Sequence, residues 1–123
     1  MVTLLRELGC AVMHHVPDRM LEGYGPNPTA LTALVARGAS LIVCVDCGTA
    51  AAEALSVLSG KADAVVLDHH KAEGAVPPVT AVVNPNRLDC LSGLRHVCAA
   101  AVSFMSMVAV HRALRRAGHF AAT

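Results

Sequence analysis

The stretch Ala64-Val65-Val66-Leu67-Asp68-His69-His70 decides the fold predicted for this chain. An uninterrupted aliphatic run is typical of a strand buried on both faces of a parallel sheet, and here it leads directly into a carboxylate and two imidazoles. Residues 41–45 repeat the pattern and lead into Asp46. Because ligands of open α/β sheets gather beyond the carboxyl ends of the strands, both polar groups should meet at one crevice. Their oxygen and nitrogen donors predict part of a divalent-metal site.

The composition predicts one small domain. The chain has 123 residues, of which 54% are hydrophobic and 15% charged. This length suffices for a real core, and the chain is too apolar to be disordered. The Phe, Trp and Tyr types contribute only Tyr24, Phe104 and Phe120. The core must therefore consist of Ala, Val and Leu, and the chain offers little for stacking single-stranded bases.

The charge pattern favours no particular partner. The net charge is +1, with an acidic excess in residues 1–86 and a basic excess in residues 87–123. The three basic residues Arg112, Arg115 and Arg116 lie near the end of the last predicted helix, where cations favour the helix terminus. A solvated helix end is therefore a simpler interpretation than a surface that follows phosphates.

The cysteines indicate a reducing, cytoplasmic compartment. Their number is odd and they are scattered through apolar segments: Cys10, Cys44, Cys47, Cys90 and Cys98. Cys44 and Cys47 have the spacing of a zinc or redox pair. Successive side chains of a strand alternate between faces, so we expect the two sulfurs to point in opposite directions and to have neither role.

No targeting or membrane segment is visible. Residues 1–10 include Arg6 and Glu7 and lack the apolar core of a secretory signal. The apolar residues 97–110 fall short of the roughly 20 residues that a membrane span needs. We predict a buried helix there, with Val97, Ala101, Phe104, Met105 and Val108 forming its apolar stripe.

The remaining segments alternate between strands and helices. Asn27 and Pro28 form a helix start, and the helix should end at Gly38. Strands are predicted over residues 10–16, 41–45, 64–67 and 80–83, and helices over residues 3–8, 28–37, 50–58 and 97–117. This order predicts an α/β fold, a Rossmann-like parallel sheet with helices on both faces. The opening helix has no strand before it, so the sequence reads as a domain that is incomplete at both ends.

Together these segments resemble the DHH phosphoesterase family, and within it the RecJ-type single-strand-specific 5′-to-3′ exonucleases. The matching blocks occur in order and cover nearly the whole chain: residues 16–27 (VPDRMLEGYGPN), 45–49 (VDCGT), 68–70 (DHH), 83–85 (VNP) and 98–102 (CAAAV). The loop in the first block distinguishes RecJ-type members from relatives that cleave short oligonucleotides or pyrophosphate.

The resemblance implies a site for two divalent ions, Mn²⁺ or Mg²⁺, that activates water against a phosphodiester. It assigns Asp46 as the bridging ligand and His69 as a ligand of one metal. Asp68 becomes a metal ligand or a residue that orients the ligands, and His70 a catalytic group facing the scissile phosphate. For Asp46 alone, a helix N-cap would explain the residue equally well, and the two histidines could be turn residues.

Two further residues are assigned to the substrate by resemblance. Arg19 would hold the 5′-phosphate of single-stranded DNA, the implied partner, although an ion pair with Asp18 or Glu22 remains an alternative. Asn84 is placed among the substrate-binding residues and is expected to fix the loop below the site. Tyr24 is expected to shape its loop.

The departures from the family pattern are as informative as the matches. The family's first motif, Asp-x-Asp-Gly on an opening strand, is absent, as is the later aspartate motif after the long helix. We therefore expect residues 1–123 to be a partial DHH domain, inactive alone, from an enzyme of DNA repair and recombination. The alternatives are a DHH phosphoesterase acting on short oligonucleotides, cyclic dinucleotides or pyrophosphate, and a non-catalytic remnant of the fold.

Overall fold

A computed structural model describes residues 1–120 of the chain. Its centre is a three-stranded parallel sheet in the order β1-β2-β3, with β1 at Leu41–Val45, β2 at Asp63–Leu67 and β3 at Ala81–Val83. The helices are α1 (Val2–Glu7), α2 (Pro28–Ala36), α3 (Ala52–Leu55), the short 3₁₀ helix η1 (Ser56–Leu58) and α4 (Ala99–Arg116). Within the described residues, no helix has the length and apolar character to cross a membrane.

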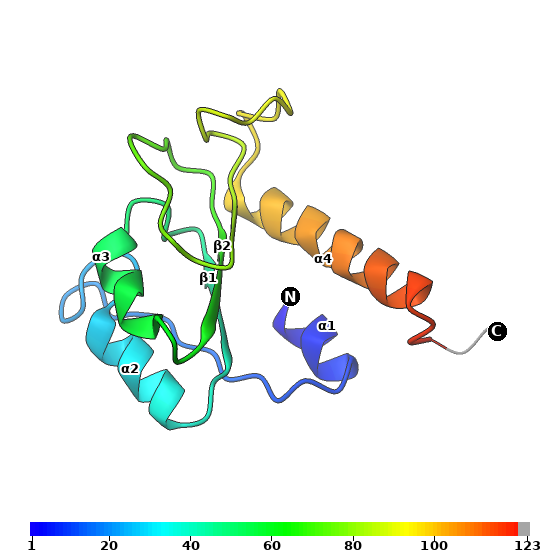
Figure 1. The fold of residues 1–123 in the computed structure, drawn as a ribbon, viewed down its shortest axis with the longest axis horizontal. Helices are drawn as coiled ribbons and strands as arrows, with labels where there is room; N and C mark the ends of the chain where they lie inside the picture. Colours follow the sequence, from blue (N-terminus) through cyan, green and yellow to red (C-terminus); the bar gives the residue numbers. More distant parts are fainter. Residues whose placement is uncertain (121–123) are drawn as a thin grey trace.

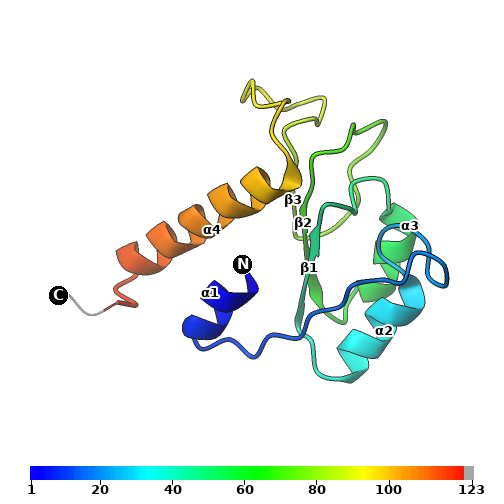
Figure 2. The same cartoon turned by 180° about the vertical axis from the view of Figure 1, so that it is seen from behind.

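The sheet has helices on both faces, as the sequence predicts. Helices α2 and α3 cover one face, and α1 and α4 lie on the other (Figures 1 and 2). The chain returns through α3 between β1 and β2, which supplies the crossover that parallel pairing requires. The strands β1 and β2 were predicted to within one residue, because buried parallel strands are continuous aliphatic runs.

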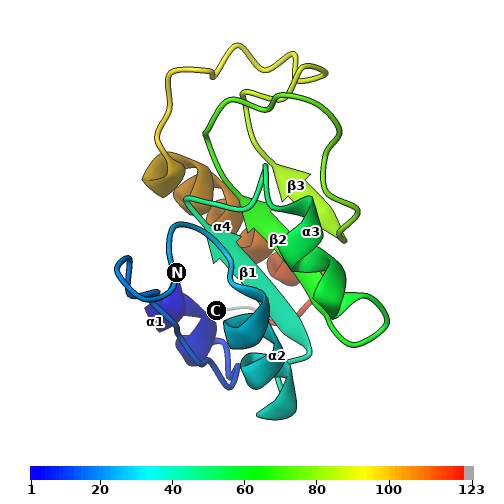
Figure 3. The same cartoon turned by 90° about the vertical axis from the view of Figure 1, so that its left-hand side faces the viewer.

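The core lies between the sheet and the α2–α3 layer. Val66 of β2 is completely buried, and Leu31, Leu55 and Leu58 reach the same cluster from the helices. Burying each such side chain contributes about 1.5–3 kcal/mol. Figure 3 shows this layer from the side of α2 and α3.

Helix α2 begins as predicted. The side chain of Asn27 accepts hydrogen bonds from the main-chain N–H groups of Thr29 (2.8 Å) and Ala30 (3.3 Å), and Pro28 occupies the first helical position. A proline costs nothing there because its missing N–H would have no helical partner. This start fixes where the loop over residues 17–27 ends and therefore where its polar residues lie.

The predicted strand over residues 10–16 is wrong. This segment is extended but unpaired, and the described part of the chain contains no strand beside it. Its hydrogen bonds go to other parts of the chain: the Cys10 N–H donates to the carbonyl of Leu5 (3.0 Å), the Arg6 guanidinium to the carbonyl of Val12 (3.3 Å), and His15 pairs with Glu22 (2.9 Å). A strand-like sequence does not make a strand without a neighbour that accepts its hydrogen bonds.

The apolar stripe predicted for α4 is also wrong. The buried residues of this helix are Ala99 and Val102, whereas Phe104 is 70% exposed and Val108 51% exposed. The helix contacts the sheet near its beginning and then extends away from it (Figure 1). The prediction of a buried helix therefore holds only for its first turn.

Candidate metal centre

Three polar residues follow directly after the three strands. Asp46 follows β1, Asp68 follows β2 and Asn84 follows β3. The pairing of the sheet continues one residue beyond the strands, because the N–H of Asp46 donates to the carbonyl of Leu67 (2.9 Å) and that of Asp68 to Val83 (3.0 Å). Parallel strands end at the same edge, so all three residues lie at one rim of the sheet.

Asp46, His69 and His70 form the cluster at this rim. One potential ligand atom from each lies within 4.8 Å of the others. Nε2 of His69 is 3.2 Å from Oδ1 of Asp46, and the two side chains are 33% and 60% exposed. A carboxylate and two imidazoles within this distance suit a borderline divalent cation such as Mn²⁺ or Zn²⁺. The donor set therefore fits a divalent metal.

Asp68 has a different position from these three residues. It is 1% exposed. Its carboxylate accepts from the N–H groups of Thr49 (3.1 Å), His69 (2.8 Å) and His70 (3.3 Å) and from Nδ1 of His70 (2.7 Å). Burial alone would raise the pKa of Asp68, but the hydrogen bonds from His70, Thr49 and His69 outweigh it and hold the pKa at about 2. Asp68 is thus an ionised anchor that orients both histidines.

The imidazole of His70 responds to the same contact. Its hydrogen bond to Asp68 raises the pKa of His70 above the usual value, against the effect of burial. The contact therefore favours the imidazolium form. The ring is half exposed and packs at 4.6 Å, centroid to centroid, against the ring of His69. His70 thus lies at the open side of the cluster with its Nδ1 bound to Asp68.

Asn84 is buried and holds the loop that carries the histidines. Its Nδ2 donates to Oγ1 of Thr49 (2.9 Å) and to the carbonyl of His70 (2.8 Å), and its Oδ1 accepts from the N–H of Asn86. Asn86 in turn donates to the carbonyl of His69. These bonds connect the chain segments that follow all three strands into one network.

The backbone of Asp46 adopts a conformation that side chains rarely accept. Its φ is +63°, the one positive value among the described non-glycine residues. Such a conformation costs of order 1–3 kcal/mol and persists where surrounding contacts enforce it. Here the Tyr24 hydroxyl donates to the carbonyl of Asp46 at 2.7 Å, and Gly48 follows with φ +110°. The turn directs the Asp46 carboxylate toward His69.

Comparison with known proteins agrees with this arrangement. The family model described as "DHH family, N-terminal domain" matches residues 1–119. The chain belongs to the DHH family.

Relatives and a solved structure specify the resemblance within the DHH family. The chain is 35% identical to the single-stranded-DNA-specific exonucleases RecJ of Bacillus subtilis and of Escherichia coli, with 85% and 97% of the chain aligned. It spans 13% and 21% of the length of these two proteins. A crystal structure of exonuclease RecJ bound to manganese aligns with a TM-score of 0.77 at 31% identity, over 92% of this chain and 29% of that one.

The aspartate and the two histidines of the DHH signature have different surroundings in this chain. The sequence predicted that Asp46, Asp68 and both histidines converge, and the structure brings them to one rim. It left open whether Asp68 is a ligand or an orienting residue, and burial with four hydrogen bonds favours the orienting role. Asn84 was placed among the substrate-binding residues, but its amide is occupied by contacts within the protein.

Arg19 does not form the alternative ion pair. Within residues 1–120 its guanidinium has no carboxylate within ion-pair distance, and it lies 5.7 Å from the ring centroid of Tyr24. Glu22 instead pairs with His15 at 2.9 Å. The Tyr24 hydroxyl also approaches Nε2 of His70 at 3.2 Å. Tyr24 thus links the arginine loop to the DHH rim of the sheet.

Three residues of this network were missed or underestimated from the sequence: Thr49, Tyr24 and Asn86. The Asn-Pro-Asn turn after β3 gives a signal for Asn86, because asparagine side chains bond the main chain in turns. Nothing in the sequence indicates that Thr49 joins Asp68 to Asn84, because that contact depends on tertiary packing.

The orientation expected for Cys44 and Cys47 is wrong. The alternation of a strand ends at Val45, and the positive φ of Asp46 turns the next side chain back. Cys44 belongs to the buried core cluster, and Cys47 packs against the same cluster.

Proposed function

We propose that these residues form part of the active site of a metal-dependent hydrolase that cleaves phosphodiester bonds of single-stranded DNA from the 5′ end, in DNA repair and recombination. The observation that carries this proposal is the 3.2 Å approach of His69 Nε2 to Asp46 Oδ1 from two neighbouring strands. The two RecJ relatives, each named for action on single-stranded DNA, support the substrate class.

Asp46 and His69 would hold a divalent ion, Mn²⁺ or Mg²⁺, and Asp46 would bridge to a second. When bound, such ions activate a water nucleophile and neutralise charge on the phosphoryl oxygens. The relative whose structure contains manganese supports the choice of metal. Asp68 would hold the main chain of both histidines in place, since buried residues behind a site set the orientation of its ligands.

The substrate phosphates would meet two basic side chains. The contact with Asp68 raises the pKa of His70, and its ring lies half exposed, so it could face the scissile phosphate. Arg19, free of carboxylates within the described residues, would hold the 5′-phosphate through two parallel hydrogen bonds. Stacking of its guanidinium on Tyr24 would restrict its orientation before the phosphate binds.

We further propose that residues 1–123 are a partial DHH domain with little activity alone. Two like-charged ions need several carboxylates to offset them, and Asp46 is the one carboxylate of the cluster.

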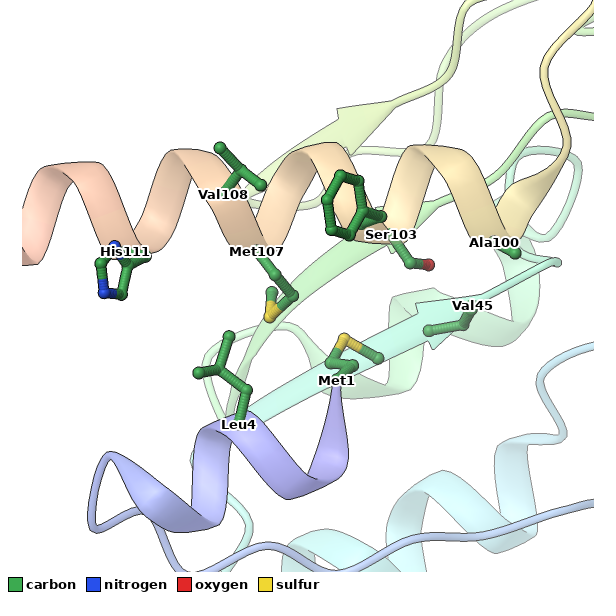
Figure 4. Close-up of a pocket in the computed structure, with 9 residues that line it drawn as sticks. Met1, Leu4, Val45, Ala100, Ser103, Met107, Val108 and His111 are labelled. Carbon is green, nitrogen blue, oxygen red and sulfur yellow. The ribbon is translucent and has the colours of Figure 1, made fainter.

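In the described part of the chain, β1 is an open edge of the sheet. An apolar cavity of about 580 Å³ lies beside this edge between α1 and α4 (Figure 4). The Ser103 hydroxyl, which lines it, is buried without a partner among these residues.

The test separates the function of the residues from the completeness of the chain. The segment of Escherichia coli RecJ that aligns with this chain, at 35% identity, is replaced by it in the full-length protein. We expect Mn²⁺-dependent degradation of long 5′-phosphorylated single strands by the chimera, at least 100-fold less by its Asp46→Asn variant, and no change with Asp89→Asn, an exposed residue far along the chain.

Two results would contradict the proposal. A folded chimera that leaves long strands intact, or prefers dinucleotides or pyrophosphate, would refute the substrate class. Robust Mn²⁺-dependent turnover by the isolated 123-residue chain would refute the claim that it is incomplete. The two readouts are independent, because the chimera supplies whatever metal ligands the chain lacks.

A further inference from the structure

One side chain connects the loop over residues 17–26 to the rim of the sheet. The other hydrogen bonds of this loop are local and join residues within 15–22. Within residues 1–120, every hydrogen bond from residues 17–26 to a later part of the chain comes from the Tyr24 hydroxyl. The position of the loop over the site therefore depends on Tyr24.

Tyr24 is held by contacts at its two ends and not by packing in the core. Its side chain is 62% exposed. The hydroxyl donates to the carbonyl of Asp46 at 2.7 Å and lies 3.2 Å from Nε2 of His70. The guanidinium of Arg19 lies over the ring, 5.7 Å from its centroid. One residue thus contacts both the arginine of the loop and the main chain of the metal site.

The hydroxyl meets the main chain where it is strained. Asp46 has a φ of +63°, a conformation that persists only where surrounding contacts enforce it. In this conformation the carboxylate approaches Nε2 of His69 at 3.2 Å. If the hydrogen bond from Tyr24 is lost, the carboxylate should occupy this position less of the time.

We propose that Tyr24 is a positioning residue that couples a terminal phosphate on Arg19 to the metal-binding conformation of Asp46. A phosphate that fixes the guanidinium also restricts the ring beside it, so the hydroxyl donates to the Asp46 carbonyl more of the time. Coupling is reciprocal, so a metal ion on Asp46 strengthens phosphate binding by the same factor. The inference rests on the proposed function, which assigns the 5′-phosphate to Arg19 and the metal to Asp46.

This coupling favours strand ends over internal positions. A terminal phosphate carries about two negative charges and three free acceptor oxygens at neutral pH, whereas a phosphodiester carries one charge. It therefore engages the guanidinium through two parallel hydrogen bonds and fixes Arg19 more firmly. The metal site is best ordered when a 5′-phosphorylated end is in place.

Manganese binding in the presence of thymidine 5′-monophosphate tests the coupling. This probe has a terminal phosphate and no phosphodiester, and thymidine is its control. For the wild-type chain we expect the nucleotide to raise the Mn²⁺ affinity at least about fivefold over thymidine, the lower end of typical coupling. Tyr24→Phe keeps the ring beside Arg19 and removes the hydroxyl, so the nucleotide should no longer change its Mn²⁺ affinity. Arg37→Gln, at an exposed arginine outside the loop, should behave like the wild type.

The outcomes separate this inference from the proposed function. An equal gain in the wild type and in Tyr24→Phe would overturn the inference, because the phosphate would then act on the metal directly. A wild-type chain that binds Mn²⁺ and the nucleotide without either strengthening the other would also overturn it, and would leave the proposed function standing. A chain that binds no Mn²⁺ would refute both.

Amide exchange in the metal-free chain, followed by nuclear magnetic resonance, tests the positioning by itself. The N–H groups of Asp46 and Thr49, on either side of the turn, are hydrogen-bonded at 2.9 and 3.1 Å. Tyr24→Phe should accelerate the exchange of both amides and leave that of Val66 in β2 unchanged. Unchanged exchange at Asp46 and Thr49 would show that the hydroxyl does not hold the turn, and would overturn the inference.

Discussion

Nε2 of His69 lies 3.2 Å from Oδ1 of Asp46, although the two residues are 23 positions apart and follow different strands. The register of the sheet accounts for this. Val45 pairs with Leu67, so the residues after them emerge side by side. Asp46 then turns through positive φ, and Asp68 holds the main chain of His69 from below. The approach is therefore built into the backbone before any metal binds.

Replacing Asp68 should lower the free energy of unfolding and make it depend less on pH between about pH 4 and pH 2. The pKa of Asp68 is about 2 in the folded state and 3.8 without its contacts. A lowered pKa stabilises the fold above the unfolded value, and the gain, on the order of 2 kcal/mol, is lost as pH falls from about 4 to about 2. Denaturant unfolding at pH 6 and pH 3 should show a smaller difference for Asp68→Asn than for the wild type.

The matched control is Asp89→Asn, which removes a carboxylate from an exposed ion pair with Arg87. Exposed pairs contribute little, so this variant should follow the wild-type pH profile. Equal pH profiles for wild type and Asp68→Asn would contradict the ionised, buried anchor.

Gly48→Ala should destabilise the chain more than Gly74→Ala. Both glycines have positive φ, so each alanine costs about 1 kcal/mol in backbone conformation. At Gly48 the added methyl would also lie 3.0 Å from Val66 Cγ2, whereas Gly74 has open space around it. Overpacking of this kind adds about 1–3 kcal/mol. Urea unfolding of both variants measures the difference, and equal losses would show that the turn does not pack as described.

Val102→Ala should cost about 1–2.5 kcal/mol and Phe104→Ala less than about 0.5 kcal/mol. Val102 is 1% exposed and Phe104 70% exposed. The two residues lie on the same helix, so each serves as the control for helix propensity in the other. A larger loss of stability for Phe104→Ala than for Val102→Ala in thermal or urea unfolding would support the apolar stripe expected from the sequence. It would contradict the placement of α4.

The contrast between Val102 and Phe104 shows which features of the fold could not be predicted from the sequence. The strands at residues 41–45 and 64–67 were predictable because a strand buried on both faces has one pattern. An amphipathic helix shows that one of its faces is apolar, but its neighbours decide how much of that face is covered, and α4 leaves the sheet after its first turn. Residues 10–16 had a strand-like sequence, but residues 1–120 contain no strand that pairs with them.

The candidate site likewise has features that could be predicted from the sequence and features that could not. Asp46 and His69 were predictable because each directly follows a strand of the same sheet. The anchoring role of Asp68 could not be distinguished from metal ligation, because burial and four converging N–H groups are properties of the folded chain. The packing of Cys44 and Cys47 against one core cluster follows the turn at Asp46, which no strand rule includes.

Tyr24→Phe should loosen the loop over residues 17–27 without unfolding the chain. The substitution removes the hydroxyl that donates to the Asp46 carbonyl and approaches His70, a loss of about 1 kcal/mol at an exposed site. Amide hydrogen exchange should accelerate in this loop, and exchange in β2 should not change. Equal acceleration throughout would show that Tyr24 supports the whole fold and does not specifically link the loop to the rim.

Manganese binding tests the central claim most directly. Mn²⁺ is titrated into the 123-residue chain and into its Asp46→Asn, His69→Ala and His96→Ala variants, with binding followed by the Mn²⁺ electron paramagnetic resonance signal and folding by circular dichroism. We predict binding by the wild type and His96→Ala, and at least tenfold weaker binding by folded Asp46→Asn and His69→Ala. Equal affinity in all four chains would contradict the convergence of Asp46 and His69 on a shared cation.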